Sequence, residues 1–324
     1  MAMVVDDEFA AIVAGHLETI EERLYTAAVA ENPFVTQAAT HVVAAGGKRF
    51  RPALVVAAAY CGDRVDAEQL VRAALVVELT HVASLYHDDV MDEADMRRGV
   101  SSANAAYGNS VAILVGDYLF ARASSEVALL GVDYVRLQAQ TFAELVQGQI
   151  AETIGAGPDD DPVEHYLGVV AGKTASLIRT SAVFGGMVGG APPEVLEALA
   201  SFGFEIGMAF QLSDDLIDVI SDDTGKTPGT DLREGIPTLP TLLLRASGDP
   251  EDRRLVELID GGLDRDEDLA IVLSGLRASA VIGQVRETIV GRADTARAYL
   301  DALPDGPAKR ALQRRCDDVV TRLS

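Results

Sequence analysis

The sequence predicts an all-α fold in which one helical bundle surrounds a deep central cavity. Apolar residues recur at spacings of three and four positions along almost the whole chain, as on one face of an α-helix, and strict alternation is rare. Aromatic residues make up only 5% of the chain and Trp is absent, so Ala, Val, Leu and Ile must build the core. An Ala-rich sequence with few alternating β-branched residues favours helix over strand.

The predicted helices follow one another with short breaks. The first covers about residues 6–28, the second ends at Gly46-Gly47, and Pro52 fits the first turn of the third. Further helices are expected at about 66–92, 110–130, 134–155, 161–184 and 193–220, with several shorter ones after about 238. Glycines and small polar residues interrupt 93–108, and 221–237 form a polar, glycine-rich loop of a length that often serves a function.

Length, charge and cysteine content limit the class of protein. The 324 residues contain no Pro/Ser-rich linker and no low-complexity segment, which predicts a single domain spanning residues 1–324. The net charge of −23 argues against nucleic acid and against an anionic membrane surface as partners. The two cysteines lie far apart, the N-terminus lacks the basic region of a secretion signal, and the apolar runs are shorter than a bilayer span. The sequence therefore predicts a cytoplasmic protein without a transmembrane segment.

A first group of acidic residues closes the long helix predicted at 66–92. Asp88 and Asp92 lie four positions apart, so their side chains share one helical face, and Asp89 lies one step round. Two carboxylates ~4 Å apart repel by about 4 kcal/mol at an effective dielectric of ~20, which a divalent cation between them would relieve. Oxygen-only ligands suit Mg²⁺. The alternative is a solvated acidic helix end, although acids at a helix C-terminus oppose the helix dipole.

A second group of acidic residues repeats this arrangement. Gln211, Asp214, Asp215 and Asp218 occupy positions i, i+3, i+4 and i+7, which form one continuous stripe at the end of another long apolar helix. We name Asp88, Asp89 and Asp92 the first aspartate motif, and Asp214, Asp215 and Asp218 the second aspartate motif. If the two motifs face each other across the cavity, they can hold several metal ions.

Basic residues occur at a few defined places in this acidic chain. Arginine matches phosphate oxygens with its planar fork and lysine supplies a compact charge, so such residues beside acidic metal ligands predict sites for two diphosphate groups. The residues in question are Lys48, Arg49 and Arg51 beside Gly46-Gly47, Arg97-Arg98 after the first motif, Lys173-Thr174, and Lys226. Alternatively, Lys48 and Arg49 are dipole partners of a helix C-terminus, and Arg97-Arg98 neutralise Asp92 and Asp95.

His81 lies seven residues before Asp88 on the same helical face. A lone histidine is more often a buried core residue, so both interpretations stay open at this point.

Together these motifs resemble the trans-isoprenyl diphosphate synthases, the polyprenyl synthetase family, which have an all-α fold of the isoprenoid synthase type. The match runs from about Lys48 to Pro240 in the family's order. It includes Gly47-Lys48-Arg49-Phe50-Arg51-Pro52, His81, Asp88-Asp89-x-x-Asp92, Arg97-Arg98-Gly99, Gly116-Asp117, Lys173-Thr174, Phe210-Gln211-x-x-Asp214-Asp215-x-x-Asp218 and Gly225-Lys226.

The resemblance implies a role for each of these residues. Three Mg²⁺ ions, or Mn²⁺ in their place, would be bound by Asp88, Asp89, Asp92, Asp214, Asp215 and Asp218. The catalytic set would be Asp88, Asp89, Asp92, Lys173, Asp214 and Asp215. Arg97, Lys173 and Lys226 would hold the allylic diphosphate, with Thr174 and Gln211 lining that site, and Lys48, Arg51, His81 and Arg98 would hold isopentenyl diphosphate. The resemblance also implies a homodimer. One departure is Ile236-Pro237 after Glu234-Gly235, where many relatives carry a lysine for the allylic diphosphate.

Two small residues bear on the length of the product. Ala83 and Ser84 lie four to five positions before Asp88, roughly 6 Å deeper along the helix, where members of the family with short products carry a large aromatic residue. The pocket should therefore continue downward and give products longer than C20, around C30–C50. The alternative is that Ala83 and Ser84 only allow close helix packing, and that another residue such as Phe120 or Phe142 forms the floor.

Other functions stay open on the sequence. A geranylgeranyl or farnesyl diphosphate synthase would use the same motifs with a shorter pocket. A terpene cyclase also uses an aspartate motif, but it has no task for Lys48, Arg51 and His81. A non-catalytic regulatory subunit typically lacks the aspartate motifs, and both are complete here.

Overall fold

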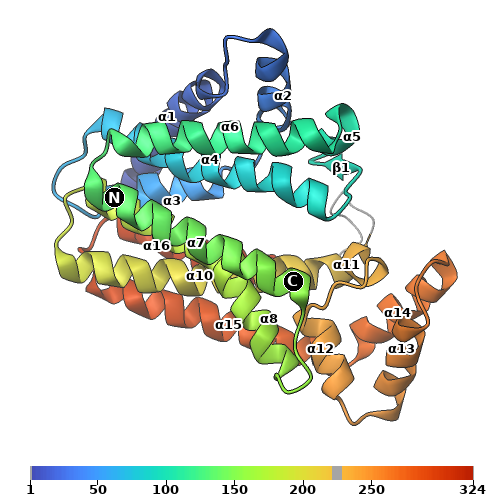
Figure 1. Cartoon of the computed structure of the whole chain (residues 1–324). Coiled ribbons are helices and arrows are strands. Elements are labelled where there is room, and N and C mark those ends of the chain that lie inside the picture. Colours follow the sequence, from blue (N-terminus) through green and yellow to red (C-terminus); the bar gives the residue numbers. More distant parts are fainter. Residues whose placement is uncertain (1, 221–227, 324) are drawn as a thin grey trace. The chain divides into compact units, whose positions relative to one another are not determined.

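The computed structural model describes residues 2–220 and 228–323 and confirms the all-α prediction (Figure 1). The chain divides into two compact units. Unit 1 comprises Met1–Phe142, Leu177–Ala200 and Leu300–Leu312, and unit 2 comprises Ala143–Ser176, Ser201–Tyr299 and Gln313–Ser324. The single domain and the deep central cavity stay predictions.

Unit 1 contains the N-terminal helices and a small hairpin. Its elements are α1 Ala2–Ala27, α2 Pro33–Ala44, α3 Phe50–Ala59, α4 Ala67–Met91, β1 Met96–Arg97, β2 Val100–Ser101, α5 Ala103–Tyr107 and α6 Asn109–Ala128. It also takes the first part of α7 Val132–Ile154, most of α9 Ser176–Val188, the 3-10 turn η2 Leu300–Ala302, and the starts of α10 Pro193–Ile220 and α16 Pro307–Thr321.

Unit 2 contains the remaining parts of α7, α10 and α16 and a set of shorter helices. These are α8 Pro162–Val170, the π-helix η1 Ala171–Ala175, α11 Thr230–Arg233, α12 Leu239–Ala246, α13 Pro250–Asp260, α14 Asp266–Ala278 and α15 Val281–Tyr299. The loop predicted at 221–237 thus includes the short helix α11, while residues 221–227 lie outside the described part of the chain.

Helix α4 is the core helix of unit 1 and positions the first aspartate motif. It packs against α1, α3 and α6, and side chains on all of its faces are buried, so it shows little amphipathicity. The Asp66 side chain caps its start by accepting from the Gln69 backbone N–H at 2.9 Å. Its last turn closes when the Asp92 N–H donates to the Asp88 carbonyl at 2.8 Å, and the β1–β2 hairpin follows, with Met96 paired to Ser101.

Helix α10 positions the second aspartate motif in unit 2. Its buried residues there follow the helical period, and Phe202, Ile206, Ala209, Leu216 and Val219 form the apolar stripe. The outer residues of the motif, Asp214 and Asp218, lie beside this stripe and are only partly buried.

A close backbone contact fixes the π-helix η1 against α7 within unit 2. A Cβ atom on Gly148 would lie 2.6 Å from the Lys173 backbone nitrogen, so only glycine allows this approach. The sequence pattern predicted one continuous helix at 161–184, and the structure places a π turn within it. Such turns are often found at functional sites.

Helix α10 also has the length and hydropathy of a membrane span. Its most apolar window has a mean hydropathy of 1.3, and 56% of that window is buried within the protein, as in the core helix of a soluble protein. Helices α14 and α15 pass the same test only as a pair that is bent by 62°. These are properties of length and composition alone, and the absence of a transmembrane segment stays a prediction.

Candidate functional site

The first aspartate motif is tied to the hairpin that follows it. Asp89 is fully buried, and Arg97 on β1 donates to its Oδ1 from Nε at 2.7 Å and also from Nη2. Arg97 therefore pairs with Asp89, not with Asp92 or Asp95 as the neutralisation alternative expected. The other carboxylate oxygen, Asp89 Oδ2, is buried without a hydrogen-bond partner in the described part of the chain. Asp88 is partly exposed and Asp92 is exposed.

The turn before α3 is held from inside the protein by Arg49. Its guanidinium donates to Glu21 from Nε and Nη2 at 2.6 and 2.7 Å, and to Glu78 from Nη1 at 2.8 Å. It also donates to the Val43 carbonyl in the last turn of α2 at 3.1 Å, as the interpretation of a helix C-terminal partner expected. Lys48, by contrast, is exposed.

The same turn is held from its other side by Arg98. The Arg98 Nη1 group donates to the Gly46 carbonyl, and a Cβ atom on Gly47 would lie 3.1 Å from the guanidinium carbon. Gly46 has a φ of +78° and Arg98 a φ of +53°. The structure thus brings together two segments, the glycine turn and the loop after the first motif, that the sequence predicted to bind isopentenyl diphosphate.

His81 on α4 lies near several of these arginines. Burial lowers the pKa of His81 well below its usual value, and the positive charges of Arg51, Arg98, Arg97 and Arg49 lower it further. A neutral imidazole among several guanidinium groups is a favourable place for an anion, because the local potential is positive and the imidazole can donate one hydrogen bond.

The second aspartate motif is held by neutral groups. Asp215 is 7% exposed, and it accepts from the Tyr166 hydroxyl of α8 and from Gln211 Nε2 at 2.8 Å. The Thr174 hydroxyl of η1 donates to Gln211 Oε1 at 2.9 Å, so Thr174, Gln211, Asp215 and Tyr166 form one chain of hydrogen bonds. Burial raises the pKa of Asp215 to about 6, although the hydrogen bonds from Tyr166 and Gln211 act in the opposite direction.

The outer aspartates of the second motif also have partners. Arg322, just after α16, donates from Nη2 to Asp214 Oδ1, and its guanidinium carbon lies 5.3 Å from the centroid of the Phe210 ring. Asp218 accepts from the Asp231 backbone N–H at 3.2 Å. Sequence reasoning missed Tyr166 and Arg322, because neither lies in a motif and their partners are distant in the chain.

Lys173 lies in the π-helix η1. Its ammonium group donates to Glu152 Oε2 of α7 at 2.5 Å, and the Gly148 contact fixes its backbone. Lys226, which the sequence predicted to bind the allylic diphosphate, lies outside the described residues.

The residues for product length lie on α4 and beside it in unit 1. Ala83 is fully buried and Ser84 is 9% exposed, and the Ser84 hydroxyl donates to the His81 carbonyl at 2.8 Å. The rings of Phe120 and Phe142 lie 4.5 Å apart between centroids. The ring centroids of His87, next to Asp88, and Phe120 lie 5.6 Å apart, so this aromatic pair lies close to the start of the first motif.

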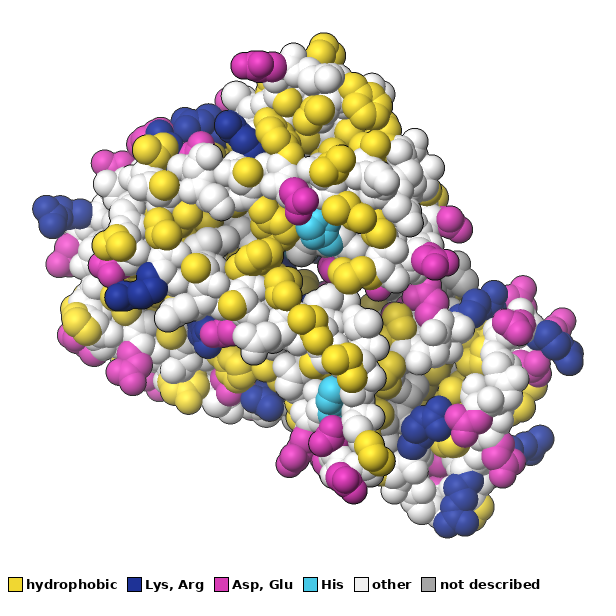
Figure 2. Space-filling view, in the orientation of Figure 1, with side chains coloured by type: hydrophobic (Ala, Val, Ile, Leu, Met, Phe, Trp, Pro, Cys, Tyr) yellow, Lys and Arg dark blue, Asp and Glu magenta, His cyan; other side chains and the backbone are white. Residues whose placement is uncertain are grey.

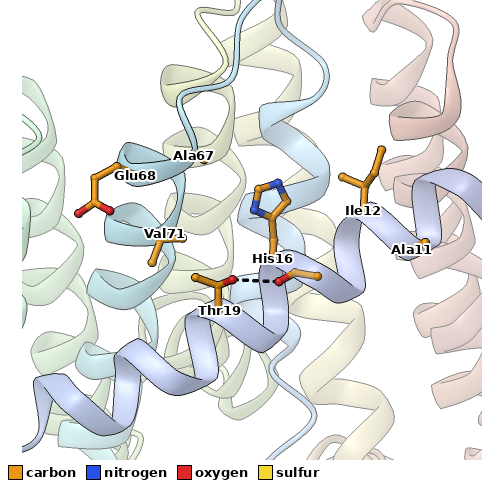
Figure 3. Close-up of a pocket in the computed structure, with 8 residues that line it drawn as sticks. Ala11, Ile12, His16, Thr19, Ala67, Glu68 and Val71 are labelled. Atoms are coloured by element: carbon orange, nitrogen blue, oxygen red, sulfur yellow. Dashed lines mark hydrogen bonds between the residues drawn. The ribbon is translucent and has the colours of Figure 1, made fainter.

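A separate pocket of about 600 Å³ opens between α1 and the start of α4 (Figure 3). It is lined by Ala11, Ile12, Gly15, His16, Thr19, Ala67, Glu68 and Val71, and the predicted site residues that the structure describes lie elsewhere. Along α4, Val71 is about 26 Å from Asp88 at 1.5 Å per residue, so this pocket is distinct from the first motif.

The donor set of the two motifs fits a divalent cation that prefers oxygen ligands. Among residues 2–220 and 228–323, no three His, Cys, Asp or Glu side chains converge on one point. Mg²⁺ is usually bound by one or two carboxylates together with substrate phosphate oxygens, so it does not need such a cluster. The buried, unpaired Asp89 Oδ2 and the carboxylates of Asp88 and Asp214 supply ligands of this kind.

The protein has an all-α fold, two helices that end in Asp-Asp-x-x-Asp, and arginines beside the first of these motifs. These features define a protein of the isoprenoid synthase class. The comparisons with known proteins agree, because the sequence model of the family "Polyprenyl synthetase" matches residues 32–274. The chain belongs to the polyprenyl synthetase family.

Similar proteins match over nearly the whole chain. The nonaprenyl diphosphate synthase of Mycobacterium tuberculosis is 46% identical over 98% of this chain and 95% of its own. A solved geranylgeranyl pyrophosphate synthase from Corynebacterium glutamicum, complexed with calcium and isoprenyl diphosphate, is 42% identical with a TM-score of 0.88 and covers 98% of both chains. A solved decaprenyl diphosphate synthase from Rhodobacter capsulatus is 33% identical with a TM-score of 0.88, over 98% of this chain and 99% of that one.

Proposed function

We propose that this chain is a trans-prenyltransferase that condenses isopentenyl diphosphate with an allylic diphosphate to give a polyprenyl diphosphate longer than C20, around C30–C50. The observation that carries this proposal is the pair of complete aspartate motifs in a chain that is 46% identical, over nearly its full length, to a nonaprenyl diphosphate synthase. Arg51, Arg97 and Arg98 around a neutral His81 give unit 1 the positive potential that a diphosphate requires.

The chemistry is positioning and charge stabilisation. Divalent ions, three Mg²⁺ by family resemblance with Mn²⁺ as a substitute, would neutralise the departing diphosphate when bound by Asp88, Asp92, Asp214 and Asp218. Asp89 and Asp215 would add ligands to these ions, and because both are buried and already accept hydrogen bonds we also assign them to orienting their motifs.

The basic residues divide between the two substrates in this proposal. Arg97, Lys173 and Lys226, with Thr174 and Gln211, hold the allylic diphosphate, while Lys48, Arg51, His81 and Arg98 hold isopentenyl diphosphate. The allylic C–O bond breaks and diphosphate leaves, the double bond of isopentenyl diphosphate forms the new C–C bond, and a proton passes to the released diphosphate to restore a double bond. No side-chain nucleophile is needed.

Product length depends on the space below the first motif. Ala83 is fully buried and lies on the helix that carries the motif, so a phenylalanine there would block a product channel that runs down beside α4. We expect Ala83→Phe to shorten the longest product by several isoprene units while retaining elongation, with Ala83→Val as the milder control. Product chains of unchanged length would mean that another residue forms the floor.

The test of the proposal is an incubation of the purified chain with Mg²⁺, radiolabelled isopentenyl diphosphate and farnesyl diphosphate, with products resolved by length. A ladder that ends beyond C20 supports the long-chain reaction. A stop at C20 would favour the second candidate, a geranylgeranyl diphosphate synthase, in line with the 42% identical relative of that name. Turnover without isopentenyl diphosphate would indicate a cyclase, and no elongation with any primer would indicate a regulatory subunit.

We further propose that the chain acts as a cytoplasmic homodimer. Figure 2 shows hydrophobic side chains on the face of the molecule that α6 crosses. Large apolar residues of α6 and α7 are exposed, with Leu114 of α6 at 67% and Val132 of α7 at 79%, which is typical of a surface that another chain covers. Burial raises the pKa of the Cys61 thiol to about 12, consistent with an unreactive thiol in a reducing compartment. The molar mass in solution tests the dimer.

A further inference from the structure

Three basic residues in a short turn differ in how they are exposed. Lys48 is exposed and Arg51 is partly exposed, whereas Arg49 between them is only 8% exposed. In the proposed function Lys48 and Arg51 bind the diphosphate of isopentenyl diphosphate, and Arg49 had no assigned part in it. A buried arginine between two ligands of the same anion calls for a separate explanation.

The Arg49 guanidinium joins three helices of unit 1. Its fork is shared between Glu21 of α1, which receives two hydrogen bonds of 2.6 and 2.7 Å, and Glu78 of α4, which receives one of 2.8 Å. The fourth bond goes to the Val43 carbonyl of α2. Glu78 is 2% exposed and lies one helical turn before His81, so the turn is tied directly to the helix that carries His81 and the first motif.

The backbone of the turn has an unusual conformation that needs such support. Arg49 has a φ of +46°, a left-handed conformation that is unfavourable for a residue with a Cβ atom. Arg98 holds the opposite side of the turn through the Gly46 carbonyl. Strained backbone persists where the surrounding contacts over-determine it, and such places cluster at ligand sites.

The charges show that Arg49 does not itself attract an anion. Its single positive charge is matched by the two carboxylates of Glu21 and Glu78, so the cluster is negative overall. Buried ion pairs contribute little to stability compared with apolar packing, and their best-attested use is to fix one arrangement of the chain. The expected effect of this cluster is therefore on geometry.

We propose that Arg49, through Glu21 and Glu78, is a positioning residue that holds Lys48 and Arg51 in the arrangement that binds the diphosphate of isopentenyl diphosphate. The inference rests on the proposed function, because it assigns part of the same site. It makes a prediction specific to one of the two substrates, since the cluster ties down the turn of Lys48 and Arg51.

The first test compares two Arg→Lys variants. Arg49→Lys keeps the charge but loses the planar fork that reaches both carboxylates at once. The matched control is Arg72→Lys on α4, where Arg72 pairs with Glu126 at 2.6 Å far from the first motif. We expect Arg49→Lys to raise KM for isopentenyl diphosphate about tenfold, the loss expected for one charged hydrogen bond, while KM for the allylic diphosphate changes less than twofold. Arg72→Lys should change neither.

The second test separates positioning from electrostatics. Glu78→Gln removes a negative charge near the arginines around His81, so a purely electrostatic effect would lower KM for isopentenyl diphosphate. Loss of positioning would raise it, and we expect a rise of about threefold to tenfold. A fall in KM would overturn the inference, and so would an Arg49→Lys variant with a lower melting temperature and unchanged KM values, or with an equal rise for both substrates.

Two further measurements keep the test decisive. If Arg49→Lys does not fold, Glu21→Gln serves instead, because Glu21 is 47% exposed at the outer side of the cluster and its loss is milder. Calorimetric titration of each variant with isopentenyl diphosphate alone reports binding without turnover. A wild-type chain that elongates no primer would refute the proposed function, whereas wild-type binding that Arg49→Lys leaves unweakened would refute only this inference.

Discussion

The two aspartate motifs have the same sequence pattern and different partners. Each closes a core helix, α4 in unit 1 and α10 in unit 2, and in each the middle aspartate is the buried one, Asp89 at 0% and Asp215 at 7% exposed. Asp89 is held by a charged group, Arg97, which follows it by eight residues. Asp215 is held by neutral donors, Tyr166 and Gln211.

This difference shows that the spacing of a motif fixes which face a carboxylate occupies but not what holds it there. The burial of the middle aspartate follows from the helix, because α4 is buried on all of its faces and Asp215 continues the apolar stripe of α10. A carboxylate held only by neutral donors remains harder to ionise, and burial accordingly raises the pKa of Asp215 to about 6.

The largest loss of activity should come from substituting the outer aspartates, and this loss should be similar in the two motifs. We expect Asp88→Asn and Asp214→Asn each to lower kcat/KM for elongation about 10³-fold, because each removes a metal ligand and metal ions contribute several kcal/mol to the transition state. Steady-state kinetics at saturating Mg²⁺ measures this. Asp264→Asn, which removes the same charge from an exposed loop, is the control. Full activity in either variant would mean that its motif binds no essential ion.

Removing a partner of the middle aspartate should lower the free energy of unfolding by different amounts in the two motifs. Arg97→Gln leaves the buried Asp89 carboxylate without its charged partner, and we expect a loss of about 3 kcal/mol in the free energy of unfolding. Tyr166→Phe removes one neutral donor from Asp215, and we expect about 1–2 kcal/mol. Urea denaturation in EDTA measures both losses. Adding Asp89→Asn to Arg97→Gln should restore much of the stability, because no buried charge then remains. Equal losses in the two single variants would contradict the comparison.

The sequence predicted the helices and both motifs because these depend on local spacing. The ends of α4 and α10 fell where the acidic residues follow the apolar ones, whereas the grouping of Arg51 and Arg98 with His81 was implied by the family resemblance. The partners that hold the motifs were not predictable in this way. Tyr166 and Arg322 lie far from the second motif in the chain, and Glu21 and Glu78 look like ordinary helix-surface acids until the fold brings Arg49 between them.

The lowered pKa of His81 should make the stability of the region around the first motif depend on pH. The pKa of His81 is lower in the folded protein than its ordinary value of 6.5, so below pH 6.5 the unfolded chain takes up a proton that the folded protein does not. The contribution of His81 to stability therefore falls as pH falls through this range, by at most about 1.4 kcal/mol per pH unit.

We expect His81→Gln to lose less stability than the wild type between pH 7 and pH 5.5, by up to about 1.4 kcal/mol. Urea denaturation at the two pH values measures the difference, and the two proteins should show the same pH dependence between pH 7.5 and 8.5. An equal loss in His81→Gln and the wild type between pH 7 and pH 5.5 would contradict the pKa direction.

The smallest effect concerns Arg322, which holds Asp214, an outer aspartate of the second motif. Its ion pair with Asp214 is partly exposed, with side-chain exposures of 28% and 39%, and such pairs contribute about 0.2–1 kcal/mol. Arg322 competes with a divalent ion for the same carboxylate oxygen. Arg322→Gln should therefore tighten Mn²⁺ or Mg²⁺ binding, measured by calorimetry, by a factor between about 1.4 and 5.

Arg315→Gln is the matched control, because Arg315 lies seven residues earlier, in α16, and pairs with Asp318 at 3.3 Å. It removes the same charge without touching the motif, so it should leave metal affinity nearly unchanged. Weaker metal binding in Arg322→Gln would mean that Arg322 orients Asp214 toward the ion, as Arg97 orients Asp89. In that case the two motifs would be held by the same kind of charged partner after all.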